Sequence, residues 1–139
     1  MGFNFSQRSL DKLKGVHPDL VAVLHEAIKR SPFDFAIVQG VRTQAEQNAL
    51  YEQGRTKPGP IVTWTRNSNH IPKADGYGHA IDFAAFVNGA LTWDEKYYPR
   101  IADTIIGVGL ELGTPVESGA YWKNKEWGHI ELAPKEGDR

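Results

Sequence analysis

The stretch spanning residues 68–83 constrains the fold most strongly, because a polar loop there runs directly into an apolar strand. It carries His70 in the loop, Gly78-His79-Ala80 at the junction and Asp82 in the strand. Loops supply reactive side chains and strands hold them in place, so imidazole and carboxylate groups at this junction can converge on one cation. The same residues also fit a solvated loop in which Asp82 only caps or forms an ion pair. A metal site therefore needs support from elsewhere in the chain.

The patterns around this stretch predict an α+β fold. Capping signals predict a short helix between Ser6 and Gly15. Apolar residues at helical spacing or end signals such as Pro, Thr and Gly predict further helices over 18–30, 44–53 and 98–112. Apolar or alternating runs predict strands over 35–39, 80–87 and 129–133, and Asn88-Gly89 is a strong hairpin signal. We expect a small antiparallel sheet with packed helices on one face and the candidate site on the other.

Alternation and helical spacing also predict which side chains are buried. In the strand 80–87, Ile81 and Phe83 share one face and Asp82 belongs to the other. An apolar stripe along the helix 98–112 is assigned to the core, and its members are Tyr97, Ile101, Ile105, Val108 and Leu112. Residues 55–78 hold three Pro and little periodicity, so they are expected to form a long loop, which is typical of functional or disordered segments.

Composition narrows the possible functions. Lys and Arg number 16 against 17 Asp and Glu, which argues against nucleic acid or an anionic membrane as partner. The chain has no Cys, so only His and carboxylates are left as metal ligands. No segment resembles a signal peptide or a membrane span, so we expect synthesis in the cytoplasm as a soluble protein without stable membrane insertion. Separately, we expect a monomer. The length of 139 residues, without a linker or repeat, predicts a single domain, 1–139.

A second polar motif, Glu126-x-x-His129-x-Glu131, lies near the C-terminal end of the chain. His129 and Glu131 flank Ile130 and so share the polar face of the predicted last strand. A carboxylate shortly before a metal-binding His can take a proton from water without binding the metal, as a general base for hydrolysis requires. Glu126 is therefore a candidate base, and the alternative is a solvated loop residue.

Arg42 lies between the predicted strand 35–39 and the predicted helix 44–53, and it follows Gln39-Gly40-Val41. A surface salt bridge is the commoner fate of an Arg. Its position at a strand end nevertheless makes Arg42 a candidate for a site built at that end.

These motifs together resemble the zinc peptidases of the D-Ala-D-Ala carboxypeptidase family, which includes vancomycin-resistance dipeptidases and phage endolysins that cleave L-alanyl-D-glutamate. The resemblance rests on Ser68-x-His70, Gly78-His79-Ala80-Ile81-Asp82 and Glu126-x-x-His129. The run 31–43 and the Asn88-Gly89 hairpin extend it over nearly the whole chain. It implies a zinc-peptidase fold of the kind that hedgehog-like domains share.

The resemblance also implies roles for individual residues. Zinc is expected to be bound by His70, Asp82 and His129. Glu126 is expected to be the catalytic base, and Arg42 to help bind the polarised carbonyl. Independently of the resemblance, Glu131 lies two residues from His129 on the same strand face, so it is a candidate supporting partner for a metal ligand or a structural partner; the sequence does not show what it contacts.

The sequence departs from the family pattern at one point. The family usually runs without interruption from the first His to the Gly and the Asp, whereas residues 71–77 separate His70 from Gly78 here. His79 is therefore an alternative first ligand. We favour His70, because Ser68-Asn69-His70 keeps the local context of the motif and strand alternation directs His79 away from the face of Asp82.

The function that the resemblance implies is a zinc-dependent peptidoglycan hydrolase, a phage endolysin that cleaves the L-alanyl-D-glutamate bond of the peptide stem. Its partner would be peptidoglycan in the periplasm, reached after the membrane is permeabilised, and no separate wall-binding domain is expected. Two alternatives stay open: a D,D- or L,D-carboxypeptidase that trims the stems, and a non-catalytic zinc-containing wall-binding module.

Overall fold

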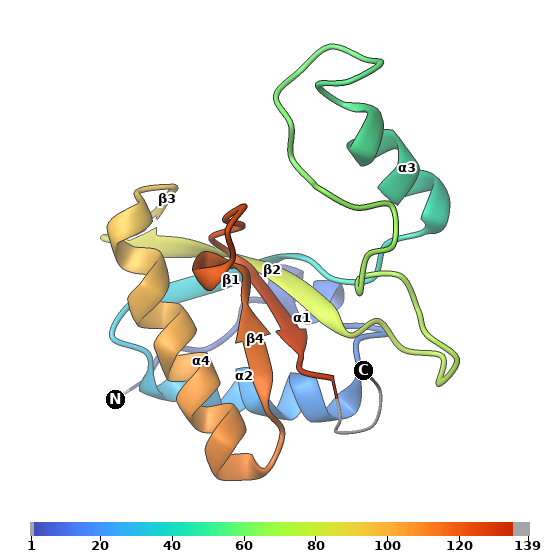
Figure 1. Cartoon of the computed structure of the whole chain (residues 1–139). Coiled ribbons are helices and arrows are strands. Elements are labelled where there is room, and N and C mark those ends of the chain that lie inside the picture. The colour runs from blue at the N-terminus through green and yellow to red at the C-terminus, as the bar shows by residue number, and fades with distance from the viewer. Residues whose placement is uncertain (1, 135–139) are drawn as a thin grey trace.

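The structure is a computed structural model that describes residues 2–134, and its centre is an antiparallel sheet of five strands (Figure 1). The strand order is β1-β2-β5-β4, and β3 pairs with β2 outside this path. The strands are β1 (Asp34–Gln39), β2 (Ala80–Val87), β3 (Ala90–Thr92), β4 (Val116–Ser118) and β5 (His129–Leu132). The helices are α1 (Gln7–Lys12), α2 (Pro18–Arg30), α3 (Gln44–Glu52) and α4 (Tyr98–Leu112), with 3-10 turns η1 (Glu95–Tyr97) and η2 (Gly119–Tyr121). The expected α+β fold with a small antiparallel sheet is confirmed.

Local sequence signals account for several helix ends. The Ser6 side chain accepts a hydrogen bond from the backbone N–H of Ser9 and so begins α1. Thr43 and Glu46 form a capping box at the start of α3, in which each side chain accepts from the backbone N–H of the other. Gly113 ends α4 in the left-handed conformation, with φ of 77°. The starts of α1 and α3 and the end of α4 therefore lie where short-range hydrogen bonding permits.

The β2–β3 hairpin is also specified locally. Asn88 and Gly89 have positive φ values of 53° and 77°, which is the conformation that a two-residue turn between twisted strands requires. Asn and Gly adopt this conformation more readily than other residues, so the turn fixes the register in which Val87 pairs with Ala90.

Two features differ from the sequence-based expectations. Strand β4, which was not predicted, pairs with β5, and its three residues are too few to show a pattern of their own. Leu112 was assigned to the core but is 49% exposed, so that assignment is wrong. It lies in the last turn of α4, immediately before the chain reverses at Gly113. Helical spacing gives the face of a residue but not how far the packed partner extends along the helix.

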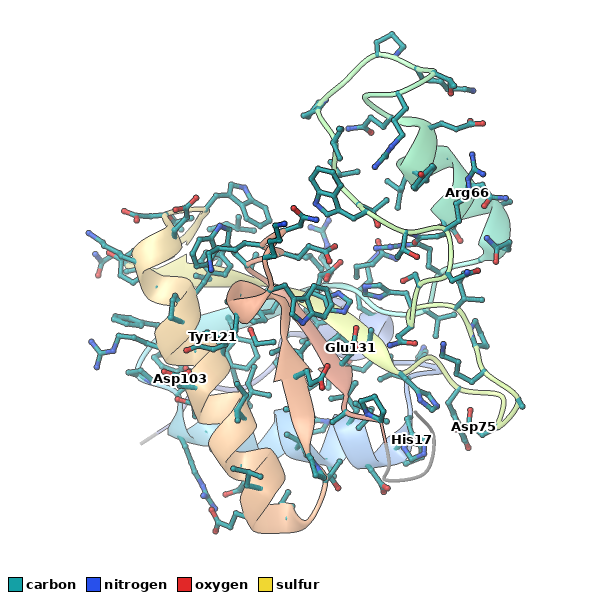
Figure 2. The ribbon with its side chains drawn as sticks, viewed as in Figure 1. His17, Arg66, Asp75, Asp103, Tyr121 and Glu131 are labelled. Carbon is teal, nitrogen blue, oxygen red and sulfur yellow. The ribbon has the colours of Figure 1, made fainter. Side chains whose placement is uncertain are left out.

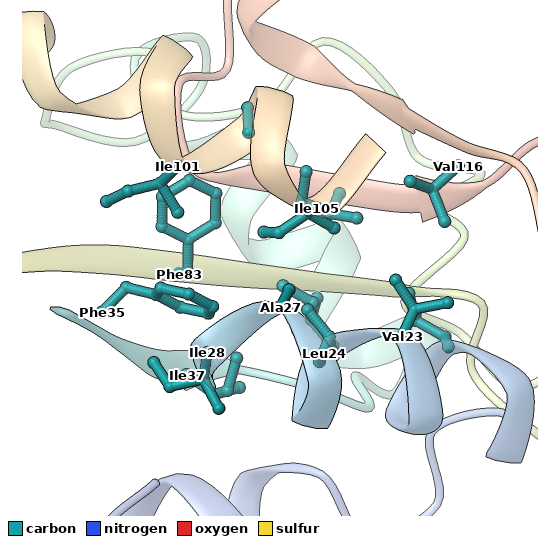
Figure 3. Packing of buried hydrophobic residues seen from close by; sticks show 14 of the residues in the cluster. Val23, Leu24, Ala27, Ile28, Phe35, Ile37, Phe83, Ile101, Ile105 and Val116 are labelled. Carbon is teal, nitrogen blue, oxygen red and sulfur yellow. The ribbon is translucent and has the colours of Figure 1, made fainter. Parts of the chain in front are cut away.

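The core lies between the sheet and the helices α2 and α4 (Figure 3). Ile81, Phe83 and Ala85 of β2 face it, as alternation predicts. Helix α4 is further tied to η2, where the Tyr121 hydroxyl donates a hydrogen bond to Asp103 (Figure 2). Buried apolar area is the main source of stability in such a domain, so this face of the sheet supports the strands that carry the polar face.

The opposite face of the sheet carries a row of polar residues. Asp82 is registered with Gln39 of β1 on one side and with His129 of β5 on the other. Directly paired residues in antiparallel strands point to the same side, so the three side chains lie side by side. Helix α3 and the loop that follows it extend away from the sheet on one side of the molecule (Figure 1). Within residues 2–134, no helix has both the length and the apolar character that a membrane span needs.

Candidate metal centre

His70, Asp82 and His129 meet in a cleft on the polar face of the sheet. One ligand atom from each lies within 4.8 Å of the other two. Asp82 is central: its Oδ2 is 3.3 Å from His70 Nε2, and its Oδ1 is 3.1 Å from His129 Nδ1. Two imidazoles and one carboxylate form a donor set that suits zinc and leaves a coordination position open. The described residues thus form a group that can hold a metal ion.

His70 is held in place from several directions. Its ring Nδ1 lies 2.8 Å from the carbonyl oxygen of Gly40, so the Nδ1–H tautomer donates there and leaves Nε2 free toward Asp82. Its backbone N–H donates to Ser68 Oγ, and its carbonyl accepts from the N–H of Arg42. The residue is 1% exposed. A metal ligand whose other ring nitrogen is engaged in this way is fixed in both tautomer and orientation.

After the inserted loop 71–77, His79 lies beside Asp75 and His17 rather than beside Asp82. His79 Nε2 lies 2.7 Å from Asp75 Oδ2, and His17 Nε2 lies 3.8 Å from the same oxygen. His17 and Asp75 are near one another at the edge of the molecule (Figure 2). His79 therefore belongs to a separate cluster that joins the inserted loop to the start of α2, and it is not part of the His70–Asp82–His129 group.

Arg42 reaches the same cleft from the turn before α3. It is 7% exposed, and its guanidinium donates to Gln47 Oε1 over 2.6 Å and to Asp82 Oδ2 over 3.4 Å. Gln47 is fully buried and in turn donates to Thr63 Oγ1. Among the described residues, the buried Nε of Arg42 has no hydrogen-bond partner. An unpaired buried donor is costly, so this N–H is a donor that the described residues leave unused.

Glu126 also lines the cleft, in the turn that leads into β5. The backbone N–H of His129 donates to the carbonyl of Glu126 over 3.1 Å, which closes the turn and brings both side chains to one region. Gly119 permits this arrangement: a Cβ there would collide with the Glu126 backbone and come within 3.0 Å of His129 Cβ. Gly119 and Glu126 are also joined by a backbone hydrogen bond of 3.0 Å.

The environment of the site shifts its ionisation equilibria. Burial alone would raise the pKa of Asp82, but hydrogen bonds with His129 and His70 outweigh it and hold the pKa below its usual range. Burial alone would lower the pKa of His129, yet its contacts with Asp82 and Glu131 raise it to about 9. Burial raises the pKa of Glu126, and the charge of His129 only partly opposes this shift. Asp82 is therefore ionised, and Glu126 is a stronger base than an exposed glutamate.

Several residues of the cleft were not anticipated from the sequence as site residues. Gln47 lies on the buried side of α3 and supports Arg42, and the Trp122 ring lies 5.0 Å from the ring of His129. Asn69 donates to Glu131 Oε2 over 2.7 Å, and Glu131 Oε1 is 2.8 Å from His129 Nε2. A Gln in a polar helix carries no signal of burial, and Asn69 is distant in sequence from its partner. Only the three-dimensional contacts identify them.

An α+β domain in which a loop His, a strand Asp, a strand His and a neighbouring Glu meet in one cleft has the arrangement of a mononuclear metal-dependent hydrolase. The chain belongs to the phage L-alanyl-D-glutamate peptidase family, whose model matches residues 1–136.

Individual relatives agree with this membership. The chain is 32% identical over 133 residues to the L-alanyl-D-glutamate peptidase of Escherichia phage T5, covering 95% of this chain and 90% of that protein. It is 35% identical over 116 residues to the peptidoglycan L-alanyl-D-glutamate endopeptidase CwlK of Bacillus subtilis, covering 80% of this chain and 68% of CwlK. The crystal structure of the L-Ala D-Glu endopeptidase ChiX of Serratia marcescens superposes with a TM-score of 0.79 at 33% identity, covering 95% and 91% of the two chains.

Proposed function

We propose that the protein is a zinc-dependent peptidoglycan hydrolase that cleaves the L-alanyl-D-glutamate bond of the wall's peptide stem and acts in phage lysis. The observation that carries the proposal is the convergence of His70, Asp82 and His129 beside Glu126 in one cleft. Membership of the phage L-alanyl-D-glutamate peptidase family supports the choice of bond.

The described residues fit zinc. His70 Nε2, an oxygen of Asp82 and His129 Nδ1 would hold the ion, because these are the atoms that face one another across the cleft. The other nitrogen of each ring is already engaged, by Gly40 O and by Glu131. When bound, zinc supplies the Lewis acid that polarises a carbonyl and lowers the pKa of water.

Glu126 is proposed to move the proton. Its carboxylate takes a proton from the attacking water as the water oxygen bonds to the alanyl carbonyl carbon. The same proton then passes to the glutamate nitrogen as the C–N bond breaks, so one residue acts first as base and then as acid. Burial raises the pKa of Glu126 toward neutral pH, where the carboxylate can accept a proton and the carboxylic acid can donate it.

Arg42 is proposed to stabilise the charge that develops on the carbonyl oxygen. Its charge is permanent, and its orientation is fixed by Gln47 and Asp82 before substrate arrives. The unpaired buried Nε–H supplies a donor that no described residue consumes. A preorganised donor of this kind contributes more to the transition state than a mobile one.

The proposal extends to where the reaction takes place. The single domain is proposed to contain the whole catalytic centre. It would act on the periplasmic wall of the host after the membrane has been permeabilised.

Release of free amino groups from purified peptidoglycan tests the proposal. The zinc-loaded protein should release them, chelator treatment should abolish release, and added zinc should restore it. His70→Ala, Asp82→Ala and His129→Ala should each remove both stoichiometric zinc and release. A protein that binds wall material without releasing amino groups would instead be a binding module, and release that survives complete removal of metal would refute the zinc mechanism.

A further inference from the structure

Glu131 contacts both β5, which carries His129, and the loop that carries His70. Its Oε1 is 2.8 Å from His129 Nε2, and its Oε2 accepts a hydrogen bond of 2.7 Å from Asn69 Nδ2. The side chain is only 13% exposed. Both carboxylate oxygens are therefore engaged, one by β5 and one by the loop that carries His70.

The contact with His129 determines which ring nitrogen is free. An imidazole has two nitrogens that face different directions, and the hydrogen bond of one fixes the state of the other. Glu131 Oε1 lies 2.8 Å from Nε2, where an N–H can donate to it, and Nδ1 faces Asp82 at 3.1 Å. Glu131 therefore lies on the side of the His129 ring away from Asp82 and is not a member of the three-residue ligand group.

The contact with Asn69 joins Glu131 to the loop that carries His70. Asn69 immediately precedes His70, and its carbonyl accepts a hydrogen bond of 2.7 Å from the backbone N–H of His79. The loop between residues 55 and 79 contains no helix or strand, and the hydrogen bonds that hold His70 itself reach Gly40, Ser68 and Arg42 rather than β5. The Asn69–Glu131 hydrogen bond is one that joins them directly.

We propose that Glu131 is a positioning residue of the metal centre, which keeps His129 protonated at Nε2 so that Nδ1 faces the metal and which joins the loop bearing His70 to β5. This inference rests on the proposed zinc function. It assigns Glu131 no contact with the metal or the substrate. It predicts that the residue controls metal affinity more than folding, because partners that orient a metal ligand typically change affinity by about 10- to 100-fold.

Zinc affinity of purified variants, measured by competition with a chromophoric chelator, tests this inference. Glu131→Ala should weaken zinc binding about 10- to 100-fold. Glu131→Gln should lose less, because its amide oxygen can still accept from His129. Glu117→Gln is the matched control: Glu117 is registered opposite Glu131 on β4 but does not line the cleft, and its zinc affinity should equal that of the wild type.

Two further readouts separate positioning from a purely structural role. Long-range ¹H–¹⁵N spectra of the zinc-loaded protein should show His129 as the Nε2–H tautomer in the wild type and in Glu131→Gln. In addition, Asn69→Ala combined with Glu131→Ala should bind zinc no more weakly than Glu131→Ala alone, since both changes break the same connection.

Zinc affinity of Glu131→Ala within about threefold of the wild type, or a wild-type His129 protonated at Nδ1, would overturn the inference. Equal loss of thermal stability in zinc-free and zinc-loaded Glu131→Ala, with affinity retained, would make Glu131 a structural residue only. These outcomes are independent of catalysis. A wild-type protein that binds zinc but cleaves no peptidoglycan would refute the proposed function and leave the affinity comparison valid.

Discussion

Replacement of Arg42 by Lys separates the structural and the catalytic roles of this side chain. The guanidinium makes two hydrogen bonds, to Gln47 and to Asp82, and presents a third donor, Nε, that has no described partner. Lys keeps the charge but has a single ammonium group, so it can satisfy one of the two acceptors and places no donor at the position of Nε.

The contacts of Arg42 allow the loss of stability and the loss of kcat in Arg42→Lys to be compared. A hydrogen bond that involves a charged group contributes about 1.5–3 kcal/mol, and Arg42 is buried, so losing one should cost about 2 kcal/mol of unfolding free energy. For a domain of this size, that corresponds to a Tm lower by about 6 °C. Loss of the donor to the carbonyl oxygen should lower kcat about 10²- to 10³-fold. Catalysis should therefore suffer far more than stability.

Thermal melts and peptidoglycan cleavage on the same zinc-loaded preparation check both figures. Arg30→Lys is a suitable control, because Arg30 pairs with Glu111 at the surface with 43% of its side chain exposed, where such pairs contribute about 0–1 kcal/mol. A folded Arg42→Lys variant that keeps zinc and cleaves within about threefold of the wild type would refute the carbonyl-binding role. A loss of stability alone would leave Arg42 as a support for Asp82.

Three further predictions follow from the same contacts. Glu126→Gln should retain stoichiometric zinc by elemental analysis while its turnover falls about 10²- to 10⁴-fold, and loss of the metal would instead make Glu126 a ligand. His79→Ala should retain zinc and activity, whereas His70→Ala should lose both; the reverse result would place the first ligand after the inserted loop. In the chelator-treated protein the folded-state pKa of His129 is raised from 6.5 to about 9, so its contribution to stability is fully present below about pH 6.5 and is lost as the pH rises through about 9. Melts of this metal-free protein between pH 6 and pH 10 should show that decline, and His129→Ala should lack it.

Local signals were sufficient to predict much of the fold. Pro18 and the apolar spacing after it gave the bounds of α2, and Asn88-Gly89 gave the β2–β3 turn, because each depends on residues close in sequence. The exposure of Leu112 and the existence of β4 depend on where distant elements end, and no local pattern encodes that.

The same distinction applies to the candidate site. The family pattern and strand alternation predicted the residues that the structure brings together, His70, Asp82 and His129. Sequence spacing alone could not separate His70 from His79, because the length of the inserted loop does not show which of the two imidazoles lies near Asp82. The connection of Asn69 to Glu131 spans 62 residues, so it can be found only in the folded chain.

Mass spectrometry of muropeptides digested by the zinc-loaded wild-type protein tests the proposed activity most directly. The proposed cleavage predicts products with a new amino terminus on D-glutamate and with L-alanine left on the muramic acid side. These products should be absent after chelation and strongly reduced with Glu126→Gln. Removal of a terminal D-alanine without this internal cut would show a carboxypeptidase instead, and the same internal cut by metal-free protein would contradict the zinc centre formed by His70, Asp82 and His129.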